Sequence, residues 1–221
     1  MPHAHTSPTS DDNKSLRQRR TAKRREDILR AATEIFGNRG YKSGSLTEIA
    51  EQVGMTHAGI LHHFGSKNQL LLAVLDYRDE ADVQDLEGKH PPEGMDLFKH
   101  LVDTARLNST RPGIVQTYAV LSADSVTDNH PAQDYFRDRF TELRAMIARS
   151  LSQICEPDAM PSSAALDTAA SAIIGVMDGL QVQWLLDDIN VDLPHATAFA
   201  IDAILAALVA GRTGSRLESD S

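Results

Sequence analysis

The segment Ser45–Lys67, SLTEIAEQVGMTHAGILHHFGSK, predicts two short helices joined by a tight turn. Ser45 and Glu48 fit a capping box, in which each side chain bonds the backbone amide of the other residue. Gly54 permits the positive φ that ends a helix, and Thr56 is a suitable cap for the second helix. A helix, a glycine-containing turn and a second helix together form the helix-turn-helix that reads the DNA major groove.

The residues before this segment are first polar and then basic. We expect residues 1–20 to form a flexible basic arm and a helix to run from about Thr21 to Asn38. Lysine and arginine crowd the stretch Lys14–Arg25, and such a run is usually a solvated face. Because it directly precedes a DNA-reading unit, the run favours contacts with phosphate or the minor groove, chiefly from Arg19, Arg20 and Arg24.

The charge of the chain is unevenly distributed. The net charge is −9, which by itself disfavours binding to DNA. Residues 14–67, however, contain eleven Lys/Arg and five Asp/Glu, a net of +6, whereas residues 68–221 contain eleven Lys/Arg and twenty-four Asp/Glu, a net of −13. Positive charge is therefore confined to the segment that would meet phosphate, and the acidic remainder should help to orient the protein on DNA.

Several short motifs agree in order and spacing with one protein family. They are Ile28–Phe36, Gly40-Tyr41, Leu46–Ala50, Val53-Gly54 and His63–Lys67. Through them the stretch from about Arg24 to Leu75 resembles the DNA-binding domain of the TetR family of bacterial transcriptional regulators. The resemblance implies an all-α regulator, most simply a repressor that a small-molecule effector releases from a palindromic operator in double-stranded DNA.

Candidate DNA contacts lie at helix N-termini and on the second helix. The N-terminal end of that helix is expected to face base edges, where Ala58 and Gly59 are small enough to let the backbone approach the groove. At Leu61 many TetR-like proteins have a tyrosine that touches DNA, so this chain either replaces or loses that contact. Besides the three arginines, the predicted contacts are Ser45, Thr47, Thr56, His57, Ala58, Gly59, Leu61, His62 and Lys67.

After Lys67 the sequence predicts helices only. A long helix to about Leu86 connects the two halves, and within it we place the end of a helix-turn-helix DNA-binding domain at residues 21–75. Residues 76–211 are expected to form a helical domain for effector binding and dimerisation, followed by a disordered tail at residues 212–221.

The C-terminal half has motifs similar to a TetR subgroup that has leucine in place of the usual tyrosine. They include His130-Pro131-Ala132, Tyr135-Phe136 and Asp178-Gly179-Leu180. The similarity implies a ligand-binding domain without identifying the ligand. Large or adaptable side chains are the candidates for its pocket, although each would serve equally as plain core: Phe98, Tyr118, Phe136, Phe140, Met177 and Trp184.

The last two predicted helices, residues 162–187 and 194–210, are rich in small and apolar residues. They could form an internal hairpin, or two such hairpins could build a four-helix bundle between two copies. Because helix-turn-helix proteins usually read two-fold sites, we favour a homodimer. The predicted interface residues are Ala169, Ile173, Leu180, Ile201, Ile204 and Leu208.

Other function classes find little support in the sequence. No nucleophile elbow, phosphate-binding glycine loop or zinc-protease motif is present, so we expect neither an enzyme nor a cofactor. His62 and His63 are adjacent and point about 100° apart on a helix, so we expect no metal site. We find no apolar run that would span a bilayer and expect a cytoplasmic protein. The alternative to a regulator is a helical dimer that binds a ligand or protein partner without binding DNA.

Overall fold

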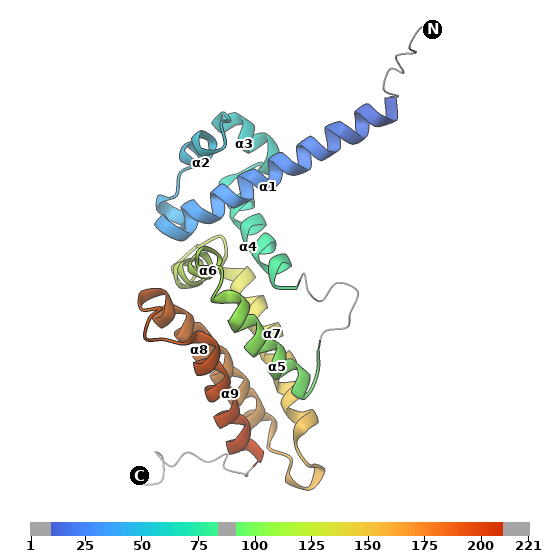
Figure 1. Ribbon diagram of the computed structural model, residues 1–221, viewed down its shortest axis with the longest axis vertical. Helices are drawn as coiled ribbons and strands as arrows, with labels where there is room; N and C mark the ends of the chain where they lie inside the picture. The colour runs from blue at the N-terminus through green and yellow to red at the C-terminus, as the bar shows by residue number, and fades with distance from the viewer. Residues whose placement is uncertain (1–9, 84–91, 210–221) are drawn as a thin grey trace, which may run out of the picture.

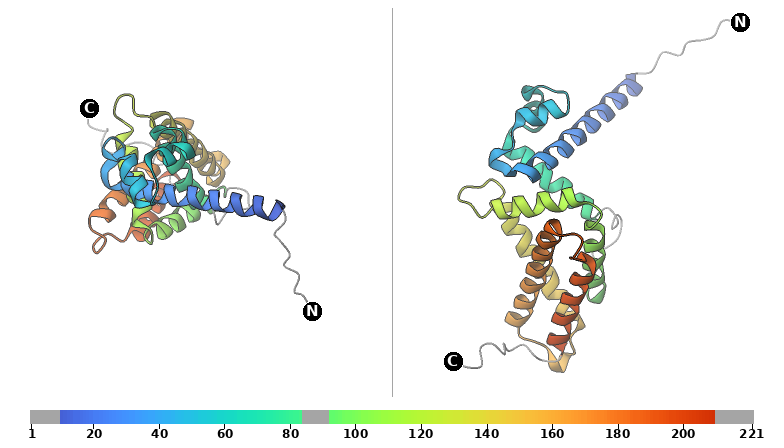
Figure 2. Two further views of the ribbon diagram at one scale, coloured as in Figure 1. Left: turned by 90° about the horizontal axis from the view of Figure 1, so that it is seen from above. Right: turned by 60° about the vertical axis from the view of Figure 1, so that its left-hand side comes forward.

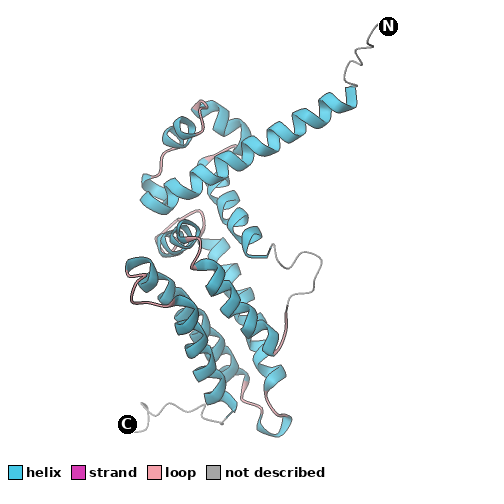
Figure 3. Ribbon diagram, viewed as in Figure 1, coloured by secondary structure: helices cyan, strands magenta, loops and turns pink. Residues whose placement is uncertain are grey.

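The computed structural model describes residues 10–83 and 92–209, and every regular element in these ranges is a helix (Figure 3). The N-terminal helices are α1 (Ser10–Ser43), α2 (Leu46–Gln52), α3 (His57–Phe64) and α4 (Lys67–Val83). The C-terminal helices are α5 (Met95–Asn108), α6 (Pro112–Asp124), α7 (Gln133–Ile154), α8 (Ser163–Leu186) and α9 (Leu193–Val209). A short 3-10 turn, Pro157–Ala159, joins α7 to α8. The predicted all-α class, with a helix-turn-helix in the N-terminal half, is confirmed.

Helix α1 begins at Ser10, inside the stretch that the sequence predicted to be a flexible arm. That prediction is wrong for residues 10–20, and the second half of the stretch, Leu16–Arg20, consists of leucine, arginine and glutamine, which are good helix formers. Figure 1 shows α1 projecting well beyond the other N-terminal helices. The rest of the predicted arm and the predicted tail lie outside the described residues.

The end of α1 is bent at Gly40. Its φ of 69° and ψ of 173° are non-helical, so the last turn of α1 takes a new direction. A Cβ atom at this position would also lie 2.6 Å from Oδ2 of Asp124, on α6. Glycine is therefore required here both for its backbone conformation and for the close approach of α6.

The turn between α2 and α3 forms largely as its sequence predicts. Gly54 has a φ of 64°, and Oγ1 of Thr56 accepts a hydrogen bond of 3.1 Å from the amide of Gly59. The reciprocal capping box is wrong: Oγ of Ser45 accepts from the amide of Thr47 at 3.1 Å, and Glu48 instead pairs with Arg39 at 2.9 Å. The tertiary position of α1 supplies a cation that a local pattern does not reveal.

One hydrophobic core joins the helix-turn-helix to the C-terminal half. It contains Phe36 of α1, Ile49 of α2 and Ile60 of α3, all fully buried. The same cluster continues into Tyr118 and Leu121 of α6, and into Ala132 and Phe136 at the start of α7. A domain boundary near Leu75 therefore remains a prediction about sequence organisation, and the packing is continuous across it.

Helices α8 and α9 form a hairpin at the side of the molecule that lies away from α3 (Figure 2). Their inner faces pack with α5 and α7 in a second core, which contains Phe98, Ile147, Leu151, Ile173 and Ile201. The outer faces of the hairpin have no neighbour among the described residues.

The long apolar helix α8 corrects one expectation. Its length and composition would allow it to cross a membrane, whereas the sequence analysis found no such run. Core helices of water-soluble proteins meet the same criterion, and α8 packs against α7 and α9. Only 28% of its apolar window is buried within the chain, so much of an apolar helix surface faces outwards.

Candidate DNA-binding interface and effector cavity

Helix α3 presents a polar face at its N-terminal end. Ile60 and Phe64 point into the core, while Thr56, His57, Ala58 and His62 are exposed. Leu61 is half-buried at the edge of this face. The cap at Thr56 and the buried anchors hold the backbone of α3, so the exposed side chains are displayed from a rigid element.

Gly59 is half-buried and has an internal role. A Cβ atom there would lie 3.0 Å from Cε of Met55 and 3.4 Å from Oγ1 of Thr56. Its small size therefore serves the packing of the turn, besides any approach of the backbone to DNA. The sequence could not separate these two uses, because the position of Met55 depends on the turn geometry.

The predicted contact residues at the starts of α2 and α4 differ in how free their polar groups are to bind DNA. Thr47 is exposed at the first turn of α2, while Ser45 is half-buried and its hydroxyl already accepts the capping hydrogen bond. Nζ of Lys67 donates to the carbonyl of Lys42 at 3.2 Å and lies 4.6 Å from the ring centroid of Tyr41. Burial lowers the pKa of Lys67. Lys67 is thus tied to the end of α1 in this structure.

Arginines of α1 fall into two groups. Arg19 and Arg20 are exposed on the projecting part of the helix. Arg24 instead donates from Nη1 to the carbonyl of Val53 at 3.2 Å, and Arg25 donates to the carbonyl of His63 at 3.3 Å and stacks 4.2 Å from the centroid of Phe64. The sequence predicted Arg24 only as a DNA contact, because its partner in the structure is the backbone carbonyl of Val53, which a pattern of side chains cannot predict.

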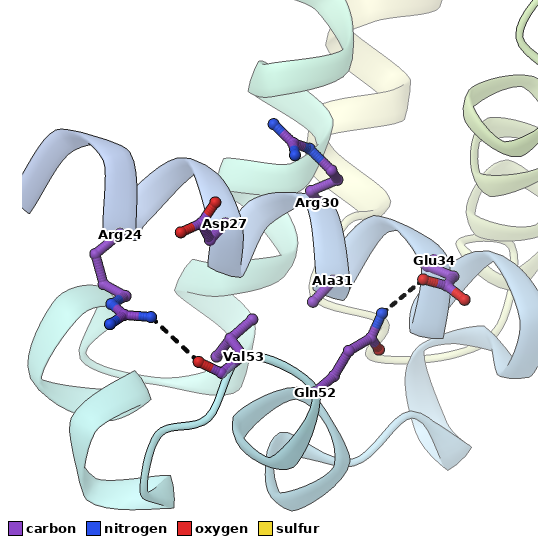
Figure 4. A pocket seen from close by; sticks show the side chains of 7 residues that line it. All are labelled: Arg24, Asp27, Arg30, Ala31, Glu34, Gln52 and Val53. Atoms are coloured by element: carbon purple, nitrogen blue, oxygen red, sulfur yellow. Dashed lines mark hydrogen bonds between the residues drawn. The ribbon is translucent and has the colours of Figure 1, made fainter.

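Figure 4 shows the surface hollow between α1 and α2 where Arg24 meets Val53. Nε2 of Gln52 donates to Glu34 of α1 at 2.6 Å in the same hollow. Asp27 and Arg30 complete its wall, so its lining has charges of both signs. These contacts fasten the helix-turn-helix to α1.

Histidines 62 and 63 do not form a metal site. Their ring centroids are 5.9 Å apart, and the described residues contain no group of three metal-ligating side chains. Burial, followed by the nearby His62, Arg25 and Arg24, lowers the pKa of His63. His62 is exposed and remains available to phosphate.

The DNA-binding half is coupled directly to α6. Oγ1 of Thr117 donates to the carbonyl of Thr33 at 2.8 Å, and Oδ2 of Asp124 accepts from the amide of Tyr41 at 3.0 Å. A Cβ atom on Gly37 would lie 2.4 Å from Oγ1 of Thr117, so α1 and α6 touch as closely as their backbones allow. These contacts connect α6 directly to α1.

A cavity of about 90 Å³ lies between α4, α5, α6, α7 and α8. Of the six predicted pocket residues, only Tyr118 and Met177 line it. Phe98 belongs to the core with α9, Phe136 and Phe140 pack in the core with α1, and Trp184 packs with Val115 and Leu193. The prediction chose large aromatic side chains, and most of these belong to the hydrophobic cores. The residues that line the cavity are Arg78, Leu101, Thr104, Asn108, Tyr118, Arg139, Leu143, Ile147, Ile174, Met177, Asp178 and Gln181.

Charged side chains form a network beside this cavity. Oδ1 of Asp79 pairs with Arg78 at 3.0 Å and with Arg139 at 2.7 Å, while the hydroxyl of Tyr135 donates to Oδ2. Burial raises the pKa of Asp178 to about 6, although Arg78 and Arg139 oppose the shift. The sequence analysis missed this network, because its members come from α4, α7 and α8 and share no motif.

The predicted dimer residues lie on different surfaces of the hairpin. Ile173 and Ile201 are 0% and 2% exposed in the core of the single chain, so neither is available to a partner in this conformation. Ala169, Ile204 and Leu208 border a hollow of about 440 Å³ along α8 and α9. Leu180 packs beside Trp184. Ala164, Thr168 and Ala172 line the same hollow from α8. The outward face continues along α8 through the exposed Gly175, Gly179 and Val182, and on α9 it contains Phe199.

Comparison with known protein families agrees with both halves of this description. Residues 28–74 match the family described as bacterial regulatory proteins, tetR family. Residues 109–210 match the C-terminal domain described as BetI-type transcriptional repressor. The first match covers the helix-turn-helix, and the second covers α6 to α9, which include much of the cavity lining and the α8–α9 hairpin.

Individual relatives are distant but cover most of the chain. The HTH-type transcriptional repressor BepR of Brucella suis is 25% identical over 85% of this chain and 92% of its own length. The HTH-type transcriptional regulator BetI of Agrobacterium fabrum is 26% identical over 81% of this chain and 85% of its own. The fold is similar to that of SmeT in its triclosan complex, with a TM-score of 0.68, 20% identity, and coverage of 83% and 90%. SmeT is the repressor of a multidrug efflux pump of Stenotrophomonas maltophilia.

Proposed function

Because the chain belongs to the TetR family of bacterial regulatory proteins and is a DNA-binding transcriptional regulator, we propose that it represses transcription as a cytoplasmic homodimer. The dimer binds a palindromic operator and leaves it when a small-molecule effector binds the C-terminal half. The observation on which the proposal depends is the exposed polar end of α3, held on a rigid core beside the positively charged α1.

The DNA contacts follow from exposure. Thr56, His57 and Ala58 read base edges, because they stand at the exposed N-terminal end of α3. Thr47, His62 and the exposed Arg19 and Arg20 bind phosphate. Gly59, Leu61, Ser45, Arg24 and Lys67 position this surface and contribute at its edge.

The outward face of the α8–α9 hairpin supports the dimer. It combines small residues on α8 with Phe199, which is 71% exposed in the single chain. Small side chains let two helices approach closely, and burial of an exposed aromatic ring against a partner is favourable. Two hairpins related by a two-fold axis place two α3 helices toward successive major grooves, ~34 Å apart.

Effector release follows from the contacts around the cavity. Arg78 of α4 lines the cavity, and only two residues separate α4 from α3. Tyr118 of α6 lines it as well, and α6 packs on α1 through Thr117. A ligand that spreads these helices changes the separation of the two α3 helices in the dimer, so ligand and DNA oppose each other by roughly 1–3 kcal/mol or more.

Footprinting of the purified protein on captured bacterial genomic fragments tests the proposal. We expect protection of an inverted repeat beside a promoter, with affinity that falls as salt rises at a log–log slope of about −4 to −7 for ~4–8 phosphate contacts. A protein that protects no fragment at low salt, both as purified and after refolding to remove bound ligand, does not have this function. Absence of salt-dependent DNA binding would favour the alternative, a helical dimer that binds a ligand or protein partner and no DNA.

A further inference from the structure

The effector cavity contains a buried donor that lacks an acceptor. Asn108 is 1% exposed, and its Oδ1 accepts from Nε and Nη2 of Arg111 at 3.1 Å and 2.9 Å. These two bonds fix the orientation of the amide, and Nδ2 is left buried with no hydrogen-bond partner among the described residues. A buried donor without an acceptor destabilises the empty cavity, and a bound acceptor would remove that penalty.

A second buried donor at the same cavity, Nε of Arg139, also lacks an acceptor within the described part of the chain. Arg139 pairs through Nη1 with Asp79, but its Nε is buried and has no partner among the described residues. Arg139 and Asn108 come from α7 and α5 and both line the cavity, together with the amide of Gln181. The polar groups at this site therefore present more donors than the chain itself satisfies.

The cavity is polar at one end and apolar at the other. Asn108 ends α5, Arg139 lies near the start of α7, and Gln181 lies near the end of α8. These ends of the three helices are the ones directed toward α6 (Figure 1). Further from α6 on the same three helices, the lining is Leu101, Leu143, Ile147 and Ile174. A ligand that fits both ends is amphiphilic, with its polar head toward α6 and the DNA-binding half.

We propose, on the basis of the function proposed above, that the effector is a small carboxylic acid whose carboxylate accepts from Arg139 and Asn108 and whose short alkyl chain lies among Leu101, Ile147 and Ile174. A carboxylate offers two acceptor oxygens, which matches two donors from neighbouring helices, and a charged acceptor makes stronger bonds to a guanidinium than a neutral one. The cavity is smaller than the ~150 Å³ that holds benzene, so the alkyl chain is short.

The charges around the cavity allow an anion to enter. Arg78 and Arg139 share Asp79, which leaves one positive charge of this group to balance Asp178. Asp178 of α8 faces Arg78 of α4, Tyr118 of α6 and Arg139 of α7, while α5 contributes no titratable lining residue. Since burial raises its pKa to about 6, Asp178 can take up a proton at little cost when a second carboxylate arrives.

Thermal shift and isothermal titration on the full-length protein test this class of ligand without DNA. The probes are butanoate, hexanoate and octanoate, with the alkylamine and the primary amide of each chain length as matched controls. We expect at least one carboxylate to raise Tm by about 2–4 °C at saturating concentration, and to bind at least tenfold more tightly than its amine and amide. Equal or tighter binding of an amine or amide, or no carboxylate binding at all, overturns the inference.

Two substitutions with opposite expected signs sharpen the test. Asn108→Asp keeps an acceptor for Arg111 but replaces the Nδ2 donor with an anionic oxygen, so carboxylate binding should weaken at least tenfold. Asp178→Asn removes the competing carboxylate, so binding at pH 7.5 should tighten. Wild-type affinity should also fall about tenfold per pH unit between pH 6.5 and 8, and Asp178→Asn should abolish that slope.

The outcomes separate this inference from the proposed function. A carboxylate that binds with the expected pattern of variants, yet leaves operator binding unchanged, supports the ligand class and contradicts effector release. An operator complex that dissociates with some other compound, while no carboxylate binds, supports the repressor and overturns the ligand class. If Asn108→Asp fails to fold, the affinity of Asp178→Asn for the carboxylate still tests the inference. Tighter binding supports it, and unchanged or weaker binding refutes the role of Asp178.

Discussion

The two halves of this molecule differ in the exposure of their charged side chains. On α1 and α3 the arginines and histidines proposed to contact DNA are exposed, as Arg19, Arg20 and His62 are. Around the candidate effector cavity Arg78 and Arg139 are largely buried and both pair with Asp79, and Asp178 is desolvated near them. An exposed charge acts on whatever approaches the surface, whereas a buried charge selects one ligand and resists change.

We expect the largest effect, loss of dimerisation and of operator binding, from a substitution on the outer face of the α8–α9 hairpin. Ala172→Glu places a charge on the outward face and should yield folded monomers, with operator affinity reduced more than about a hundredfold because one α3 helix reads only half a site. Light scattering and gel-shift titration measure the two quantities. Leu107→Glu, on the exposed side of α5, is the matched control and should leave both unchanged. A dimeric Ala172→Glu protein would place the interface elsewhere.

The prediction from the sequence that Ile204 and Leu208 belong to the dimer interface can be tested in the same assay. Both border the hollow along the hairpin, so Leu208→Asp should also reduce dimerisation, but it removes a side chain that is only 6% exposed. Chemical denaturation then distinguishes the two substitutions, because only the inner one should lower the free energy of unfolding, by about 2–5 kcal/mol.

Base reading by α3 should give the next largest effect. His57→Ala together with Thr56→Ala should weaken binding to the operator by about 1–3 kcal/mol per lost base contact, and weaken binding to random DNA much less. Thr56→Ala also removes a helix cap worth about 1 kcal/mol of stability, so Thr56→Ser, which keeps the hydroxyl, is the control. Equal losses on operator and random DNA would refute a role in base reading.

The contact between the halves can be broken at a single glycine. Gly37→Ala places Cβ 2.4 Å from Oγ1 of Thr117 and should destabilise the protein by about 1–3 kcal/mol, since α1 and α6 must separate. Gly113→Ala on α6 has no atom within 4 Å and should instead stabilise it by about 0.4–1 kcal/mol. Urea denaturation measures both variants. A neutral Gly37→Ala would mean that the two halves are less tightly coupled than their packing indicates.

The smallest expected effect concerns the buried carboxyl of Asp178. Its pKa is about 6 in the folded chain against about 3.9 when unfolded, so the folded state holds a proton between these values that the unfolded state has lost. The free energy of unfolding therefore falls as pH rises from 4 to 6. Asp178→Asn should raise stability by about 1–2 kcal/mol at pH 7.5 and change it little near pH 4. An equal effect at both pH values would exclude ionisation as the cause.

The sequence predicted most where structure is local. The ends of α2 and α3, the cap at Thr56 and the positive φ of Gly54 depend on residues within a few positions, and the prediction placed them well. The capping box was wrong because a distant group intervened: Glu48 pairs with Arg39. The hydrogen bond from Arg24 to the carbonyl of Val53 was also outside what the local sequence predicts. The extent of α1 was underestimated, because a run of charges was taken to indicate flexibility in a stretch of good helix formers.

The effector cavity could not have been predicted in the same way. Large aromatic residues were the natural candidates, yet Phe98, Phe136 and Trp184 fill three separate cores, and small polar residues such as Asn108 line the cavity. Burial of an amide is a property of its neighbours, and Asn108 has its neighbours on α6, α7 and α8.

By itself the sequence determined the helical class, the helix-turn-helix and the concentration of positive charge beside it, because helix periodicity, caps and charge runs are encoded by neighbouring residues. The tertiary structure alone decided which arginine of α1 binds the carbonyl of Val53, which face of the α8–α9 hairpin is left uncovered and which donors at the cavity lack acceptors. These properties depend on contacts between residues far apart in the chain, and such contacts exist only once the helices have packed.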